Sequence, residues 1–297
     1  MKGVLFFGFM CATFMNCYGR VCSDMAYDIP MATWNSQGGR WGTVKTLLSH
    51  TYPDVEVLAL QECGNPPIDP AIALVGNGNI PTQWSDNRPY LTVQYISYFY
   101  NNGDINQRDN GSGAKEYTIN VRDRGHVQRI YYLYHYELQL AGNVRTNTAI
   151  ITKTRANEVF VLIDPNESRP VIGFRIGSNY YFSMHAGAYP KNPSPDTVSQ
   201  IAQFVSNNAM PMEDVSFVVM GDFNTEPNYF NPTVIPRGFH FTKVLPSEKT
   251  QGLGNTVVRL YDYAFIGTRN TCEFPNFIVN AGNKYDSDHR VVVFRRQ

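Results

Sequence analysis

The sequence predicts a fold in which two layers of β-strand form the core and helices flank them. Many short runs are rich in Val, Ile, Tyr and Phe, as strands are, and turn residues separate these runs. Helical periodicity is clear in only two stretches, and strands and helices do not alternate regularly. With 43% hydrophobic and 17% charged residues among 297, the chain has ample material for a core and is not a disordered, solvating chain.

The N-terminal nineteen residues differ in character from the rest of the chain. Lys2 provides a positive start, residues 3–15 are almost wholly apolar, and polar Asn16 and Arg20 close the run. This pattern predicts a secretory signal peptide at residues 1–19, with a buried N-terminal strand or helix as the alternative. Since no later stretch approaches transmembrane length and no repeat or linker divides the chain, we expect residues 20–297 to form one exported, soluble domain.

The predicted elements follow in chain order. Strands are expected at residues 31–35, 55–60, 91–100, 130–136, 148–151, 159–163, 171–176, 180–184, 215–220, 257–266 and 291–294. Helices are expected at 41–50, where apolar residues form one stripe, and at 194–208, which opens on Pro195 and Asp196. Residues 63–89 and 101–114 are rich in Gly, Asn, Pro or Asp and are interpreted as long surface loops.

Charge and cysteine content limit the possible function classes. Lys+Arg and Asp+Glu both number 25, so a polybasic tail is excluded and any polyanion site must be a local cluster. Of the five cysteines, Cys22, Cys63 and Cys272 follow the predicted leader. Three allow one bridge and a spare thiol, or a bond to a partner chain, and none has zinc-site spacing.

The strongest chemical signal is a strand that ends in Gly-Asp-Phe-Asn. Asp222 and Asn224, two residues apart, would project to one side of an extended backbone, with Phe223 turned into the core. A carboxylate beside an amide at a strand end would ligate a hard cation or hold an attacking water. Taken alone, the pair would more often be turn chemistry.

Other predicted strands also end or begin in polar groups. These are Asn35, Glu62, His185, Asp262 and the pair Asp288 and His289. A buried Asp262 would need a partner, and an imidazole is the natural one. Any one of these residues has a simple structural explanation, but together they indicate one active site.

This set of motifs resembles the endonuclease/exonuclease/phosphatase superfamily typified by deoxyribonuclease I, and within it the family of catalytic chains of cytolethal distending toxins. The matching segments, in the same order as in that family, are residues 33–38, 61–62, 129–132, 147–151, 168–173, 185–186, 221–224, 261–263 and 287–289. The resemblance implies a four-layered α/β sandwich, of α+β class, with two packed mixed sheets and helices outside. It also implies metal-dependent phosphodiester hydrolysis.

The resemblance also implies a role for each candidate residue. Mg²⁺, or another divalent cation such as Mn²⁺ or Ca²⁺, would be bound by Glu62, with Asn35 and Asp288 close by. His289, oriented by Asp262, and His185 would act at the scissile phosphate, and Asp222 and Asn224 would position water and phosphate. Arg129 or Arg145 would contact phosphate oxygens. Gln128 stands where the family is expected to carry a carboxylate that orients the first histidine, so His185 is expected to lack an anionic partner.

The leading hypothesis is therefore a secreted toxin subunit that nicks DNA in the nucleus of a target cell and is delivered there by partner subunits. One alternative keeps the site but changes the substrate, giving a phosphoinositide phosphatase. Another is a catalytically inactive exported binding protein with the same fold. In such a protein the polar residues at the strand ends would no longer be present.

Overall fold

The computed structural model describes residues 24–67, 72–79, 83–84, 92–96, 114–122, 128–137, 147–163, 169–187, 196–210, 214–232, 235–252, 258–269 and 273–297. The predicted signal peptide, Cys22, Cys272 and Arg145 lie outside these residues. Cys63 is a buried free thiol. No helix in the described part of the chain combines the length and apolar character that a membrane span requires.

Two eight-stranded sheets form the body of the structure. Sheet A contains, in spatial order, β15 (Phe277–Ala281), β16 (Val292–Arg296), β1 (Met31–Asn35), β2 (Val57–Gln61), β8 (Thr148–Thr152), β7 (Gln128–Tyr136), β6 (Ala114–Arg122) and β3 (Ile72–Asn79). Sheet B contains β13 (His240–Val244), β14 (Asp262–Thr268), β12 (Ser216–Asp222), β11 (Asn179–His185), β10 (Val171–Ile176), β9 (Glu158–Ile163), β5 (Thr92–Ile96) and β4 (Gln83–Trp84).

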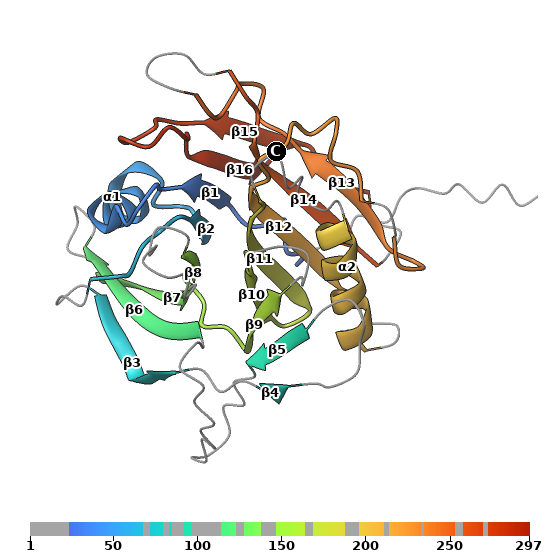
Figure 1. The fold of residues 1–297 in the computed structure, drawn as a ribbon, viewed down its shortest axis with the longest axis horizontal. Coiled ribbons are helices and arrows are strands. Elements are labelled where there is room, and N and C mark those ends of the chain that lie inside the picture. Colours follow the sequence, from blue (N-terminus) through green and yellow to red (C-terminus); the bar gives the residue numbers. More distant parts are fainter. Residues whose placement is uncertain are drawn as a thin grey trace, which may run out of the picture.

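Alternating side chains on the strands build three apolar layers. Met31 and Val57 of sheet A pack against Val218 and Met220 of sheet B in the central layer. The neighbouring positions point outward and are covered by helices, as period-two alternation requires. α1 (Trp41–Thr46) and the π-helical turn η1 (Leu47–Thr51) cover sheet A, and α2 (Asp196–Asn208) covers sheet B on the opposite side (Figure 1).

The predicted sandwich of two mixed sheets is confirmed, with a thin helical layer on each outer face. The helix expected at 41–50 is divided, because α1 gives way to η1 at Leu47. Within the strand expected at 257–266, residue 257 lies outside the described residues, and the strand begins only at Asp262, after the irregular residues 258–261. The expected loop at 63–89 contains β3 and β4, so that interpretation was wrong in part.

The strand directions bring the polar strand ends together. β1 and β2 run parallel in sheet A, as β11 and β12 do in sheet B. Asn35, His185 and Asp222 are therefore the last residues of strands that end at one edge of their sheets. β14 and β16 run antiparallel to β12 and β1, so both begin at this edge, and Asp262 lies directly opposite Asp222.

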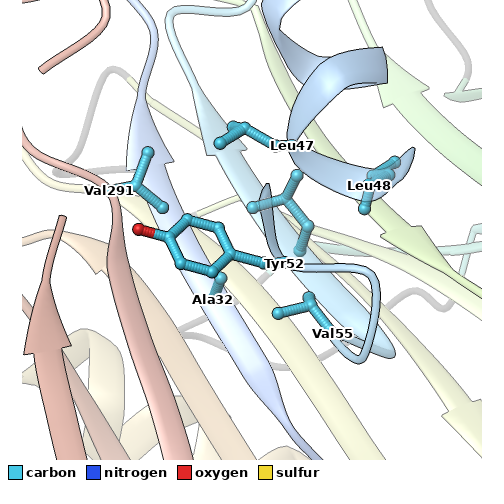
Figure 2. A pocket seen from close by; sticks show the side chains of 7 residues that line it. Ala32, Leu47, Leu48, Tyr52, Val55 and Val291 are labelled. Atoms are coloured by element: carbon cyan, nitrogen blue, oxygen red, sulfur yellow. The ribbon is translucent and has the colours of Figure 1, made fainter. Parts of the chain in front are cut away.

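A small apolar cavity lies between sheet A and its helical cover. Figure 2 shows the Tyr52 ring crossing it beside Leu47 of η1 and Ala32 of β1. All of its other lining residues are aliphatic, so it offers no acid–base chemistry.

Candidate active site

Acidic, amide and imidazole side chains from strand ends of both sheets meet in one cluster. We call it the polar cluster; its members are Asn35, Glu62, His185, Asp222, Asp262, Asp288 and His289. Asn35 is the last residue of β1 in sheet A, and Glu62 directly follows β2 of the same sheet. Residues 185, 222 and 262 belong to strands of sheet B, while 288 and 289 lie in the segment that leads into β16 of sheet A. The site therefore spans the two sheets at the end of the sandwich where strands β1, β2, β11 and β12 finish.

Asp222 lies at the centre of the polar cluster. Its Oδ2 atom is 3.6 Å from Nε2 of His185 and 3.6 Å from Nε2 of His289. The Asn35 amide donates to the same oxygen at 2.9 Å. Burial raises the pKa of Asp222, and the charge of His289 and the hydrogen bond from Asn35 act in the opposite direction. One carboxylate thus connects the two imidazoles.

His289 is paired with Asp262, as the sequence predicted for a buried acid. Nδ1 of His289 lies 2.9 Å and 3.1 Å from the two Asp262 carboxylate oxygens, and both residues are buried. Burial by itself would lower the pKa of His289, but the Asp262 and Asp222 carboxylates outweigh it and raise the pKa to about 10. His289 is therefore an imidazolium at neutral pH.

His185 is held in the opposite charge state. Burial, the Arg169 guanidinium and His289 all lower its pKa, so its imidazole is neutral. Arg169 donates to Nε2 of His185 and, at 3.2 Å, to the carbonyl of Ala186. The proton of His185 therefore resides on Nδ1, which is buried and has no hydrogen-bond partner among the described residues. The sequence predicted that His185 lacks an anionic partner, but its Nε2 lies 3.6 Å from carboxylate oxygens of both Glu62 and Asp222, so two carboxylates lie beside this imidazole.

Asn224 is placed by a turn rather than by an extended strand. β12 ends at Asp222, and Asn224 has a φ of 49°, in the left-handed region that Asn tolerates. Its backbone N–H donates to Asp222 Oδ1 at 2.9 Å, and its side-chain amide donates to the Ala186 carbonyl at 2.9 Å. Phe223 points into the core as predicted, where it stacks on Tyr263 with 4.2 Å between ring centroids.

The loop that follows β2 holds Glu62 in an unusual backbone conformation. Glu62 has a φ of 49°, which is uncommon for a residue other than Gly, Asn or Asp. Its carbonyl accepts from the N–H of Gly38 at 2.6 Å and from the Ser36 hydroxyl at 3.2 Å. These bonds hold the Glu62 backbone in place, and Oε1 of its side chain lies 3.6 Å from Nε2 of His185.

A buried polar contact aligns the two sheets immediately behind the site. Gln61 Nε2 donates to the Ser183 hydroxyl at 3.0 Å, and Gln61 Oε1 accepts from Thr33 at 3.2 Å. Gln61 and Ser183 are both fully buried. Because they stand one and two residues from Glu62 and His185, this contact sets the distance between the acid of sheet A and the imidazole of sheet B.

The carboxylates fit a hard divalent cation. Asp288 Oδ1 is buried and has no hydrogen bond in the described part of the chain, although Nε2 of His289 lies 3.5 Å away, and a bound cation would satisfy it. Glu62 and Asp288 keep 24% and 20% of their side chains exposed, which leaves room for the waters that Mg²⁺ retains. Asp222, Asp262 and His289 form a tighter group of possible ligands, within 4.8 Å of one another, but His289 already uses Nδ1 for Asp262.

Asn35 departs from its expected place as a metal ligand. Its amide nitrogen faces Asp222 and, at 3.4 Å, Glu62, while its oxygen accepts from the N–H of Gln37 at 3.2 Å. An amide nitrogen carries no lone pair for a cation. In this structure Asn35 therefore connects two carboxylates and does not present a ligand atom.

The expected phosphate contact of Arg129 is not supported by its position. β7 runs in the same direction as β2, because each is antiparallel to β8. Arg129 stands near the start of β7, away from the polar cluster, and donates to the Pro53 carbonyl at 2.7 Å. Gln128 is the first residue of β7, so it lies at that same remote end and does not occupy the place of an orienting group for His185.

Arg169 is the site residue that sequence reasoning missed. In the β10–β11 hairpin, Ile172 pairs with Ser183, so residues 169 and 186 are brought level. The sequence did contain a signal for this position, namely a predicted β-hairpin. The predicted strands 171–176 and 180–184 are separated only by a short turn containing Gly177. Extending that hairpin by three residues would have placed a guanidinium beside His185.

Comparisons with known proteins agree with this geometry. The profile of the endonuclease/exonuclease/phosphatase family matches residues 32–289. The B subunit of the cytolethal distending toxin of Escherichia coli is 28% identical over 87% of this chain and 85% of its own length. A homologue of that toxin chain from Salmonella typhi is 27% identical over 84% of this chain and 82% of its own.

Solved structures extend the similarity to the fold. A structure of CdtB, described as the biologically active subunit of cytolethal distending toxin, is 27% identical, with a TM-score of 0.67 over 91% of this chain and 98% of that one. The Haemophilus ducreyi cytolethal distending toxin has a TM-score of 0.66 at 24% identity over 91% and 99% of the two chains. Enzymes of the matched family generally use divalent metals, and the acidic and imidazole groups of the polar cluster suit that chemistry. From its fold, its converging polar strand ends and its matched profile, the chain belongs to the endonuclease/exonuclease/phosphatase family.

Proposed function

We propose that this protein is a divalent-metal-dependent nuclease that nicks DNA by phosphodiester hydrolysis. The observation that carries the proposal is the Asp222 Oδ2 atom with an imidazole on each side, each Nε2 at 3.6 Å, beside the partly exposed Glu62 carboxylate. The site thereby combines a neutral imidazole, a charged imidazole and carboxylates for a cation. Phosphoryl transfer needs these three groups: a base, an acid and a positive charge near the phosphate.

The different charge states of the imidazoles divide the acid–base work. His185 has an unprotonated Nε2, so it takes a proton from the attacking water once a bound phosphate draws Arg169 away from that nitrogen. His289, charged and held by Asp262, donates its Nε2 proton to the leaving oxygen. Each such proton transfer contributes ~10²–10⁴-fold to the rate.

Positive charge at the phosphate comes from two sources. Glu62 and Asp288 would hold Mg²⁺, or Mn²⁺ or Ca²⁺ in its place, and the bound ion supplies Lewis acidity toward the phosphoryl oxygens. Arg169 is close to His185 and offers planar N–H donors that suit phosphate oxygens. Asp222, tied to the Asn224 backbone at 2.9 Å, orients the water.

We further propose that the protein is the catalytic chain of an exported toxin. Support comes from relatives named as the B chains of cytolethal distending toxins, which match over most of both sequences, and from the apolar leader at residues 1–19. The expected partners are DNA and the delivery subunits of a toxin complex, and the expected place of action is the nucleus of a target cell. Copurification of further exported chains with the native protein would test the complex.

Plasmid relaxation tests the nuclease proposal. The protein without residues 1–19 should convert supercoiled plasmid to the open circular form with Mg²⁺, and a chelator should stop it. His185→Ala and Asp288→Ala should each abolish nicking while leaving the melting transition nearly unchanged. His240→Ala, on the exposed face of edge strand β13, is the matched control and should nick as the wild type does.

A parallel assay separates the alternatives. Phosphate release from a phosphoinositide without plasmid nicking would refute the nuclease proposal and favour a phosphatase that uses the same groups. Neither activity in any divalent metal would favour an inactive binding protein. If the His185 and Asp288 variants unfold, these residues serve the core and the catalytic assignment is wrong.

A further inference from the structure

A short segment outside both sheets bridges the two strand ends that carry the acidic groups. Residues 250–252 lie between 258–262, which leads into β14 of sheet B, and 288–290, which leads into β16 of sheet A. Gln251 forms antiparallel bridges with Arg259 on one side and with His289 on the other. We call this segment, Thr250 to Gly252, the bridging segment.

Thr250 contacts the backbone of the acid that pairs with His289. Its hydroxyl oxygen accepts from the N–H of Tyr261 at 3.1 Å and from the N–H of Asp262 at 3.0 Å. Thr250 is completely buried, so no water replaces this acceptor. The bond to Asp262 fixes the first residue of β14, where the carboxylate must point away from sheet B toward His289.

Gln251 and Gly252 contact the other acid. Gln251 Nε2 donates to Asp288 Oδ2 at 3.5 Å, and the Gly252 N–H donates to the Asp288 carbonyl at 3.1 Å. On the far side, the Asp288 N–H donates to Gln37 Oε1 at 3.1 Å. Because Oδ2 receives Gln251, Oδ1 is the carboxylate oxygen without a hydrogen bond among the described residues; it lies 3.5 Å from Nε2 of His289.

We propose that Thr250 and Gln251 are positioning residues, through which one segment sets Asp262 behind His289 and orients Asp288 toward the metal. This inference rests on the proposed metal-dependent function. The two residues act on different groups, so their substitution should produce different defects. If the two residues had a purely structural role, either substitution would lower the stability of the protein, its Mn²⁺ affinity and its kcat together.

The experiment measures Mn²⁺ binding to the metal-free protein by calorimetry and, separately, kcat and KM of nicking. Gln251→Met should weaken Mn²⁺ binding by roughly 10–100-fold, the usual effect of losing a group that orients a metal ligand. Thr250→Val should lower kcat by about 10–100-fold with KM and Mn²⁺ affinity close to wild type. Thr250→Ser, which keeps the oxygen, should restore kcat.

The control is Gln203→Met, the same chemical change on an exposed residue of α2 that pairs with Asn207. Equal Mn²⁺ affinity in the wild type, Gln251→Met and Gln203→Met proteins would overturn the role of Gln251 and leave the proposed function intact. If Thr250→Val unfolds, Gln251→Met still decides the inference. A wild-type protein that binds no Mn²⁺ would refute the metal site and this inference with it.

Discussion

Acid should destabilise this protein in part through His135, a residue to which no catalytic role is assigned. His135 is buried on β7, and its Nε2 donates to the Gly64 carbonyl at 2.8 Å, two residues beyond Glu62. Its Nδ1 has no hydrogen-bond partner among the described residues. Burial lowers the pKa of His135 to about 4, although the bond to Gly64 and the charge of Glu137 act in the opposite direction.

The sign and size of the effect follow from proton linkage. The unfolded chain binds a proton on this imidazole below about pH 6.5, whereas the folded protein binds it only below about pH 4. Stability is therefore lost as the pH falls between these values. The shift corresponds to ~3 kcal/mol in full and ~2 kcal/mol at pH 5.

Urea unfolding at pH 7.5 and pH 5 measures this loss. His135→Gln keeps a donor for Gly64 but does not titrate, so its loss between the two pH values should be ~2 kcal/mol smaller than that of the wild type. The quantity compared is the change in unfolding free energy between pH 7.5 and pH 5 in each protein. This comparison cancels the pH-independent cost of the substitution and the contribution of other titrating groups, including His185. His240→Gln, on an exposed strand edge, is the control. Equal losses in the wild type and His135→Gln proteins would refute the reasoning.

Three further predictions concern the site and the strands that support it. Asp262→Asn should lower kcat of nicking by ~10²–10⁴-fold, because a neutral amide does not stabilise the charged imidazole that it contacts; a rate near wild type would contradict the assigned pair. Arg169→Lys should raise KM for DNA about 10-fold, since an ammonium lacks the planar fork of donors; an unchanged KM would remove Arg169 from phosphate binding. Gly221→Ala should destabilise the fold by ~1–3 kcal/mol in chemical denaturation, because its Cβ would collide with the backbone of Met184 on the parallel neighbouring strand. Gly42→Ala, whose Cβ would meet nothing within 4 Å, is the control and should not lose stability. An equal response of the two glycine variants would show that the collision is relieved by movement of the strands.

Much of the sandwich could be predicted from local sequence pattern. Runs such as Val57–Gln61 and Ser216–Asp222 are mostly apolar, and each is buried along its whole length. The edge strand His240–Val244 and the partly exposed Ala114–Arg122 were missed. In the second of these, buried Tyr117, Ile119 and Val121 alternate with partly exposed residues, so the period-two signal of a strand was present in the sequence. In His240–Val244 only Val244 is buried, so pairing with β14 rather than a side-chain pattern makes it a strand.

The sequence alone determined which residue types would carry the chemistry and that they would stand at strand ends. A buried carboxylate indicated an imidazole partner for Asp262, and the family resemblance implied that this partner is His289. The tertiary structure decided the rest: the neutral state of His185 beside Arg169, the amide nitrogen that Asn35 turns to its carboxylates, and the remote position of Arg129. These depend on strand direction and on contacts between the two sheets, and neither is encoded in the spacing of residues along one segment.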